Sequence, residues 1–271
     1  MSIEQDGGVD EAPGHPSGLS TEAMVRRVQS FDSVFYDRIA EQVTDLPFGV
    51  ARLTPELPRV YSINGVEVTK PAALSEVLRA TEVVMTTAEM RHRLVFTSVP
   101  EVAWTLGPGL TDRGWSMSRT VYMVHDGVTE PLVSPLGFDL VDIERWTAVS
   151  AAFTADNEWG RSAPVQADMV GRDRRVAERI DTTFVLSSNG QAGCHVYRGA
   201  GTAQIEQVHV LSEARGHGHG TGLLAKALQV AANERLTFLI ADADDWPRQW
   251  YERWGFVAVA SAWEWLRLPT E

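Results

Sequence analysis

A glycine-rich turn between an apolar strand and an amphipathic helix is the feature that most limits how this chain folds. An apolar run ending at Leu211 precedes the turn, and a helical pattern beginning at Leu223 follows it. Such a strand, turn and helix form a site for an anionic phosphate. The glycines let backbone N–H groups approach the anion, and the helix N-terminus adds a positive dipole end. The turn consists of Arg215, Gly216, His217, Gly218, His219, Gly220, Thr221 and Gly222.

The spacing of these glycines excludes two familiar phosphate-binding motifs. No Gly-Lys-Ser/Thr sequence ends the turn, so it is not the P-loop of nucleoside triphosphatases. The glycines also lie one residue out of the dinucleotide fingerprint, and no acid-bearing second strand is clear about 20 residues on. The pattern that fits is Arg-x-x-Gly-x-Gly at the start of a helix.

This pattern resembles the acyl-CoA pyrophosphate loop of the GNAT N-acyltransferase superfamily. Downstream, Tyr251 is followed after three residues by Gly255 and Phe256, which resembles the second signature of that family. The two signatures stand in the family's usual order and separation. The resemblance implies an N-acetyltransferase with acetyl-CoA as co-substrate. It would transfer the acetyl group to a primary amine of a small molecule by direct attack in a ternary complex.

Hydrophobic periodicity in the second half alternates between the helical and the strand period. Helices are predicted over Glu144–Trp159, Pro164–Ile180, Gly218–Asn233 and Trp246–Trp254. Strands are predicted over Phe138–Ile143, Thr182–Ser187, Gln191–Tyr197, Thr202–Leu211, Leu236–Ala241, Phe256–Ala260 and Ala262–Leu268. This order of elements resembles that of the GNAT fold. We therefore expect an α/β fold with a mixed sheet, in which residues 137–271 form the complete acyl-CoA-binding catalytic domain.

The first half has a less regular pattern. It predicts a helix over Thr21–Val43, a strand over Val60–Ile63, and an ending at Leu110–Trp115 that looks like the family's last helix and Gly-Phe in degenerate form. No Arg-x-x-Gly-x-Gly occurs in this half. We infer a degenerate GNAT-like domain over 21–126, similar to tandem members of the family. The alternative is an unrelated α/β extension.

The resemblance also implies how the donor binds. The backbone of Val208, His209 and Val210 would pair with the pantetheine arm as if it were an added strand, and an N–H of this strand would stabilise the oxyanion. The loop from Arg215 to Thr221 would bind the pyrophosphate. Its two histidines form His-x-His, but no third ligand has suitable spacing, so we expect no metal.

Three side chains are candidates for proton transfer. Tyr251 matches the family's tyrosine and would give a proton to the leaving thiolate, unless it only packs between its tryptophan neighbours. Glu206 would deprotonate the amine through a water. By the two-residue strand period, its side chain shares a face with Val208 and Val210. His209, with a pKa near 6.5, is the competing base. The alternative for either is a satisfied polar residue lining a cleft.

Acceptor contacts are less specified by the sequence. Gln204, on the same strand as the candidate base, and Glu158 and Trp159, at the end of the first helix of the second half, are the candidate substrate-binding residues. In relatives the loop after this helix closes over the acceptor. A donor other than acetyl-CoA (a longer acyl-CoA, a carrier-protein thioester or an aminoacyl-tRNA) and a non-catalytic acyl-CoA-binding module are the alternatives.

Composition limits partners and location. The net charge of −12 argues against nucleic acid as a partner. The single cysteine, Cys194, cannot form an intrachain disulfide, and no run of about 18 apolar residues predicts a membrane span. We expect a cytoplasmic protein, as a monomer or homodimer. Residues 1–20, acidic and rich in glycine and proline, are predicted to be a disordered tail, and residues 127–136 a linker.

Overall fold

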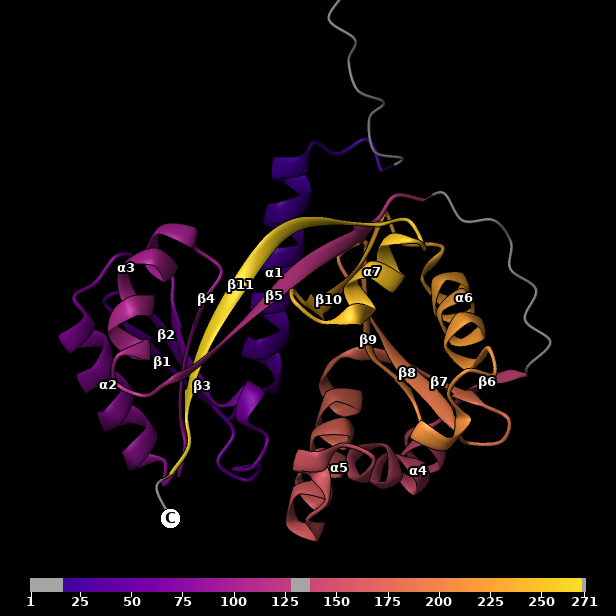
Figure 1. The fold of residues 1–271 in the computed structure, drawn as a ribbon, viewed down its shortest axis with the longest axis horizontal. Helices are drawn as coiled ribbons and strands as arrows, with labels where there is room; N and C mark the ends of the chain where they lie inside the picture. Colours follow the sequence, from indigo (N-terminus) through magenta and orange to yellow (C-terminus); the bar gives the residue numbers. More distant parts are fainter. Residues whose placement is uncertain (1–16, 128–136, 270–271) are drawn as a thin grey trace, which may run out of the picture.

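A computed structural model describes residues 17–127 and 137–269 (Figure 1). The elements of the first half are α1 (Thr21–Ile39), β1 (Gln42–Leu46), β2 (Gly49–Leu53), β3 (Gly65–Val68), α2 (Leu74–Thr87), β4 (Arg93–Thr97), α3 (Pro100–Thr111) and β5 (Ser116–His125). Those of the second half are β6 (Phe138–Val141), α4 (Ile143–Ala155), α5 (Ala163–Arg179), β7 (Asp181–Ser187), β8 (Ala192–Gly199), β9 (Thr202–Val210), α6 (His219–Ala231), β10 (Leu236–Asp242), α7 (Trp246–Glu252) and β11 (Phe256–Arg267). Short 3₁₀ turns lie at Tyr61–Ile63, Glu158–Gly160 and Ser212–Ala214.

All strands of the described residues join one mixed sheet, in the order β1-β2-β3-β4-β11-β5-β10-β9-β8-β7-β6. The two halves exchange strands at its centre. β5, from the first half, pairs antiparallel with both β10 and β11, and β11, from the second half, pairs antiparallel with β4. Figure 1 shows β5 and β11 side by side across the middle of the molecule. The sheet therefore runs without a break from one half into the other, as expected of a mixed α/β fold.

The two exchanged strands begin in the same way. Gly114 precedes β5 with φ +78°, and Gly255 precedes β11 with φ +77°. Both glycines occupy the left-handed region, where a residue without Cβ ends a helix at little cost. The aromatic residue after each glycine, Trp115 or Phe256, is buried. This correspondence supports the inference of a second, degenerate unit.

The structure differs from several of the elements predicted from periodicity. The helix predicted over Glu144–Trp159 ends at Ala155, and a 3₁₀ turn follows at Glu158–Gly160. The helix predicted over Thr21–Val43 ends at Ile39, because the chain becomes extended at Ala40 and then forms β1 against β2. The strand predicted over Val60–Ile63 is wrong, because the 3₁₀ turn lies there and the strand follows it as β3. The two strands predicted at the C-terminus are one, β11, with a register shift between Ala258 and Ala260. Most of the predicted tail and linker lie outside the described residues.

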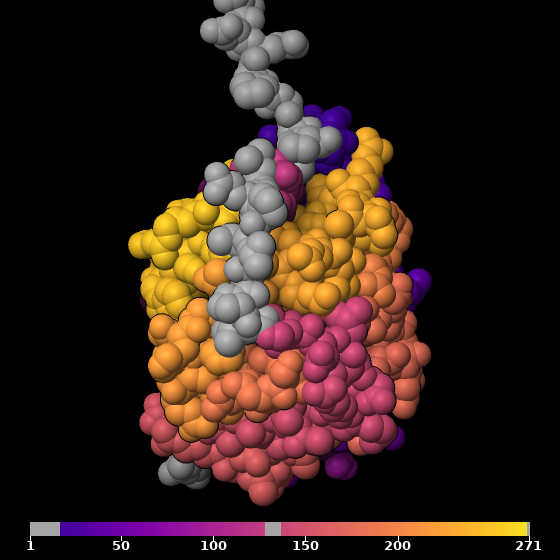
Figure 2. Space-filling model, turned by 90° about the vertical axis from the view of Figure 1, so that its right-hand side faces the viewer, coloured from indigo at the N-terminus to yellow at the C-terminus, as the bar shows by residue number. Residues whose placement is uncertain are grey.

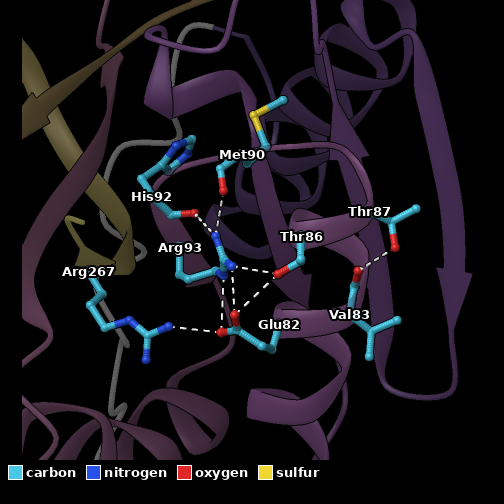
Figure 3. Close-up of polar contacts among 8 residues, drawn as sticks. All are labelled: Glu82, Val83, Thr86, Thr87, Met90, His92, Arg93 and Arg267. Atoms are coloured by element: carbon cyan, nitrogen blue, oxygen red, sulfur yellow. Dashed lines mark hydrogen bonds and ion pairs between the residues drawn. The ribbon is translucent and has the colours of Figure 1, made fainter. Parts of the chain in front are cut away.

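A cluster of Glu82, Arg93 and Arg267 connects the end of β11 to the first half of the chain (Figure 3). Glu82 of α2 accepts hydrogen bonds from Arg93 Nη2 of β4 at 2.6 Å and from Arg267 Nη2 of β11 at 2.9 Å. Hydrogen bonds from Arg93, more than any other effect, lower the pKa of Glu82 to about 2. Its carboxylate thus remains charged at neutral pH and bridges both strands.

Helices cover both faces of the sheet in the second half. Phe184 and Leu186 of β7 pack in a cluster with Trp146 of α4, whereas Val185 between them packs in a cluster with Leu224 of α6. Since alternate strand residues point to opposite faces, α4 and α6 lie on opposite sides of the sheet. Among residues 17–127 and 137–269, no helix is long and apolar enough to cross a membrane.

Candidate active site

The parallel strands β9 and β10 separate partway along their length. Their pairing extends from Thr202 opposite Leu236 to Ile205 opposite Leu239, yet β9 continues to Val210 and β10 to Asp242. On its other side β9 stays paired with β8. The edge of β9 from residue 206 to residue 210 therefore has no strand partner towards β10 in the described structure. An exposed edge of this kind accepts an added extended chain.

A β-bulge interrupts β9 at the same point. Glu206 pairs with His195 and His209 with Gly193, so Gln207 and Val208 together lie opposite one residue of β8. Gln207 has φ +52°, in the left-handed region that non-glycine residues rarely adopt. A bulge re-aims the side chains and backbone groups that follow it.

The bulge overturns one expectation from the strand period. Val208 and Val210 pack against the core that includes α6, on the side of Ile205. Glu206, in contrast, lines a cavity between the two halves of the chain. The prediction that Glu206 shares a face with these valines is wrong, because the extra residue in β9 reverses the alternation beyond Glu206. Strand parity by itself cannot reveal such an insertion.

A cavity of about 600 Å³ lies beside the open edge of β9. It is bounded by the end of β9, by the glycine-rich turn and by α7. These elements belong to the second half of the chain, which forms most of the side of the molecule shown in Figure 2. The predicted site residues that line it are Val208, His209, Val210, Arg215, Gly216, Gly218, His219, Gly220, Thr221 and Tyr251. Asp245, Trp246, Pro247 and Trp250 complete the wall on the α7 side. We call this cavity the donor cleft.

The start of α6 directs backbone donors into the donor cleft. Gly218 caps the helix with φ +83°, and the N–H of Gly222 makes a helical bond of 3.1 Å to its carbonyl. The N–H groups of His219, Gly220 and Thr221 come before this bond, in the first turn of the helix, where they lack intrahelical acceptors. The positive end of the helix dipole adds to them. This part of the cleft suits a phosphate group.

An acidic side chain anchors the turn to β9. Asp156, at the end of α4, accepts hydrogen bonds from Ser212, from Arg215 Nη2 at 3.1 Å and from His209 Nε2 at 3.1 Å. Burial acts to raise the pKa of Asp156, but the hydrogen bonds from Ser212 and the nearby cations outweigh it, so the pKa is lowered. The guanidinium of Arg215 also donates to the Val210 carbonyl. Arg215 thus holds the turn in place from the wall of the cleft.

The contact with Asp156 also fixes His209. Burial, the largest effect, lowers the pKa of His209 in spite of the Asp156 carboxylate. The imidazole packs on Phe153 of α4, with ring centroids 5.2 Å apart. His209 is therefore neutral near pH 7 and held in one orientation.

Tyr251 packs between aromatic neighbours and also lines the donor cleft. It is only 9% exposed, and its ring contacts Trp250 and Phe256 at centroid distances of 5.1 and 5.9 Å. It also lines the donor cleft, and its hydroxyl has no hydrogen-bond partner in the described structure. Burial, followed by the charge of Glu206, raises the pKa of Tyr251. The phenol is thus protonated and free to donate a hydrogen bond.

Glu206 lies in the second cavity, which we call the central cavity. It has a volume of about 320 Å³ and lies between the two halves. Gln204 Nε2 donates to Glu206 Oε2 at 2.9 Å, and burial raises the pKa of Glu206 despite the nearby charge of Arg172. A carboxylate with a raised pKa takes up a proton more readily than a solvated one.

Three predicted residues lie apart from these cavities or at their margin. His217 is exposed and does not line the donor cleft. Glu158 is exposed and pairs with Arg161 at 3.9 Å. Trp159 is 61% exposed and borders a smaller cavity of about 140 Å³ with Gln207 and His209. Of these three, only Trp159 adjoins β9.

Sequence reasoning missed how Asp156, Asp32 and Arg172 are used. Asp156 and the turn lie far apart in the sequence, and no motif links them. Asp32 belongs to α1 and lines the central cavity with Arg172 of α5. A polar residue on an amphipathic helix gives no signal by itself, because solvated faces have the same pattern. Cys194 is buried in the core, and burial raises the pKa of its thiol. In the described residues no cluster of three or more His, Cys, Asp or Glu could hold a metal ion.

The second half of the chain matches a known protein family, and the whole chain resembles solved structures. The family model described as Acetyltransferase (GNAT) family matches residues 146–256. A conserved protein of unknown function from Staphylococcus epidermidis is similar in structure, with a TM-score of 0.68, 19% identity, and coverage of 89% of this chain and 98% of its own.

Two solved structures named as N-acetyltransferases are also similar. A GCN5-related N-acetyltransferase from Kribbella flavida has a TM-score of 0.63 at 21% identity, covering 96% of this chain and 98% of its own. Another from Sphaerobacter thermophilus has a TM-score of 0.54 at 15% identity, covering 93% and 88%. At such identities these likenesses establish the fold. No curated protein matches the sequence significantly.

Proposed function

We propose that this chain, whose residues 146–256 match the acetyltransferase (GNAT) family model, transfers an acetyl group from acetyl-CoA to a primary amine of a small molecule. One observation carries the proposal: the open edge of β9, the first turn of α6 and Tyr251 all border the same cleft. An extended thioester with a phosphorylated end needs these three elements together. The free, buried cysteine supports a cytoplasmic location as part of the proposal.

Donor binding uses backbone groups. The pantetheine arm pairs with the unpartnered edge of β9 as an added strand. The pyrophosphate lies at the start of α6, where N–H groups and the helix dipole favour negative charge. Arg215 keeps the turn attached to β9 through Asp156. The tryptophans of α7 form the opposite wall.

The reaction forms one bond and breaks one. The amine nitrogen attacks the thioester carbon, the new N–C bond forms, and the C–S bond breaks as the thiolate leaves. The N–H of Val208, re-aimed by the bulge, stabilises the oxyanion between these steps. Glu206 takes the proton from the amine, directly or through a water. Tyr251 donates a hydrogen bond to the thiolate sulfur. Because a thiol ordinarily titrates near 8.5, below this phenol, full proton transfer follows only if the dry cleft also raises the pKa of the thiol.

The choice of base favours Glu206 over His209. Glu206 lines the central cavity, and its charge, after burial, raises the pKa of Tyr251 in the donor cleft. The Nε2 atom of His209 is already bonded to Asp156. We therefore propose that His209 and Asp156 position β9, while Glu206 accepts the proton.

The test is acetyl-CoA binding measured by calorimetry on two glycine variants. Gly218→Ala places a Cβ in the left-handed conformation at the start of α6, at a cost of about 1–2 kcal/mol, so binding weakens about tenfold. Gly114→Ala is the matched control. Gly114 has a similar φ, lies far from the cleft, and likewise has no atom within 4 Å of the added Cβ. Equal acetyl-CoA affinity in both variants contradicts the donor assignment.

A further inference from the structure

The central cavity contains more carboxylates than acetyl transfer requires. Four acidic residues from four elements line it: Asp32, Glu206, Asp242 and Glu264. None of them lies within 4.0 Å of a Lys, Arg or His nitrogen in the described residues. Among the residues that the structure describes, Arg172 is the only basic side chain in the wall, and it is paired with Asp173 at 3.4 Å. The described lining of the cavity thus holds more acidic than basic side chains, and none of the four carboxyl groups is in an ion pair with a described residue.

Aromatic rings occupy much of the remaining wall, with Phe35, Tyr36, Phe96, Tyr122, Tyr197 and Trp263 contributing. The faces of such rings attract cations through their quadrupole. Carboxylates and rings together are the lining expected around an organic cation with an apolar stem. A simple metal ion would instead find few oxygens converging on one point.

A buried polar group in the same wall also lacks a partner. Gln204 is 4% exposed, and its Nε2 donates to Glu206. Its Oε1 has no hydrogen-bond partner in the described structure. Because leaving a buried acceptor without a donor is unfavourable, this oxygen points to a donor that enters with a ligand. An ammonium group supplies such donors.

The first half of the chain contributes one of these carboxylates from a fixed position. Asp32 lies on α1, and its Oδ2 accepts a hydrogen bond of 2.8 Å from the Tyr122 hydroxyl of β5. This contact holds the carboxylate at the wall of the cavity. Asp32 thus comes from the first half of the chain, whereas Glu206 comes from the second. Asp32 and Glu206 line the same cavity.

We propose that the central cavity binds the acceptor as a small diamine, with the reacting nitrogen at Glu206 and a second, charged nitrogen at Asp32. The degenerate half thereby determines acceptor specificity. The role of Glu206 in this statement rests on the proposed function, whereas the binding of a second ammonium by Asp32 does not.

The proposal also predicts proton release. Burial raises the pKa of Asp32 to about 7. The groups that face it are Tyr36, Arg52, Glu67, Tyr122 and Glu206, of which Tyr122 and Arg52 lower its pKa and the two glutamates raise it. A bound ammonium lowers the pKa of Asp32, so at pH 7 about half a proton leaves for each diamine bound.

The experiment compares putrescine and cadaverine with n-butylamine and n-pentylamine, by calorimetry on the full chain with CoA present. We expect each diamine to bind about tenfold more tightly than its matched monoamine, the effect of one charge-assisted hydrogen bond. Asp32→Asn keeps an acceptor for Tyr122 but removes the charge, so this preference and the proton release disappear. Asp45→Asn, at an exposed aspartate on β1, keeps both.

Each outcome has a defined meaning. Equal binding of diamines and monoamines by the unmodified chain overturns the proposal, and a preference that survives in Asp32→Asn overturns the role of Asp32. Acetyl-CoA binding is measured in every variant to show that the fold is intact. If Asp32→Asn does not fold, Tyr122→Phe takes its place, because it removes the hydrogen bond that holds the Asp32 carboxylate at the wall. It should reduce the preference for the diamine, and an unchanged preference overturns the role of Asp32. Failure of acetyl-CoA binding in the unmodified chain refutes the proposed function. The preference for diamines over monoamines is a separate measurement, and it tests the binding of the second ammonium by Asp32 whatever the result for acetyl-CoA.

Discussion

Separating the two halves should unfold the catalytic one. The perturbation is to produce residues 137–271 alone, without β5. In the intact chain β5 fills the position between β10 and β11. Its residues Val121, Tyr122, Met123 and Val124 are each at most 5% exposed. Burying one such side chain stabilises a fold by about 1.5–3 kcal/mol, so losing four removes about 6–12 kcal/mol.

That loss is comparable with the whole stability of a domain, about 5–15 kcal/mol. The assay is urea unfolding followed by circular dichroism, together with calorimetric titration of acetyl-CoA. We expect the fragment to show no cooperative transition and no binding. Co-production of residues 1–127 with 137–271 is the control, because it restores β5 without the covalent connection, and it should recover both signals. A fragment 137–271 that unfolds cooperatively and binds acetyl-CoA like the intact chain would show that the catalytic half folds without β5.

Three further predictions concern single side chains. Tyr251→Phe should bind acetyl-CoA normally but lower kcat by about 10²–10⁴-fold; an unchanged kcat excludes the hydrogen-bond role. Glu206 must be ionised to act as base, so activity should fall as pH drops through its raised pKa. Glu206→Gln should lose this acidic limb of the pH–rate profile, and a retained limb assigns the base elsewhere. Glu82 has its pKa depressed from 4.5 to about 2, so its stabilisation is complete above about 4.5 and disappears as pH falls towards 2. Since the Glu82 side chain is 53% exposed, Glu82→Gln should cost under about 1 kcal/mol at pH 7, and a loss that persists at pH 2 contradicts the assignment.

Local features of the site could be predicted because the chain encodes them within a few residues. The turn from Arg215 to Gly222 needs glycine where φ is positive, and the structure finds Gly216 and Gly218 there. The tryptophan-flanked Tyr251 and the turn at Gly255 follow the same logic, since helix end, glycine and strand are neighbours in sequence. The alternation of helices and strands in the second half also followed from periodicity.

Features that depend on a partner far along the chain could not be predicted. The bulge at Gln207 is defined only against β8, and it moves Glu206 away from the valines that the strand period assigned to its face. The ion pair between Arg215 and Asp156 joins residues that no motif connects. Val60–Ile63 has the composition of a strand, but the hydrogen-bonded turn at this position takes precedence over propensity.

Local sequence patterns predicted the elements around the donor cleft: a glycine-rich turn, a tyrosine in a short helix, and the order of elements between them. These depend on backbone conformation and periodicity, which are local properties. The exchange of β5 and β11 between the halves, and the cavity that Asp32 shares with Glu206, became visible only in the folded chain. Strand exchange and a shared cavity arise from packing between distant segments, and no local pattern of residues specifies which segments will meet.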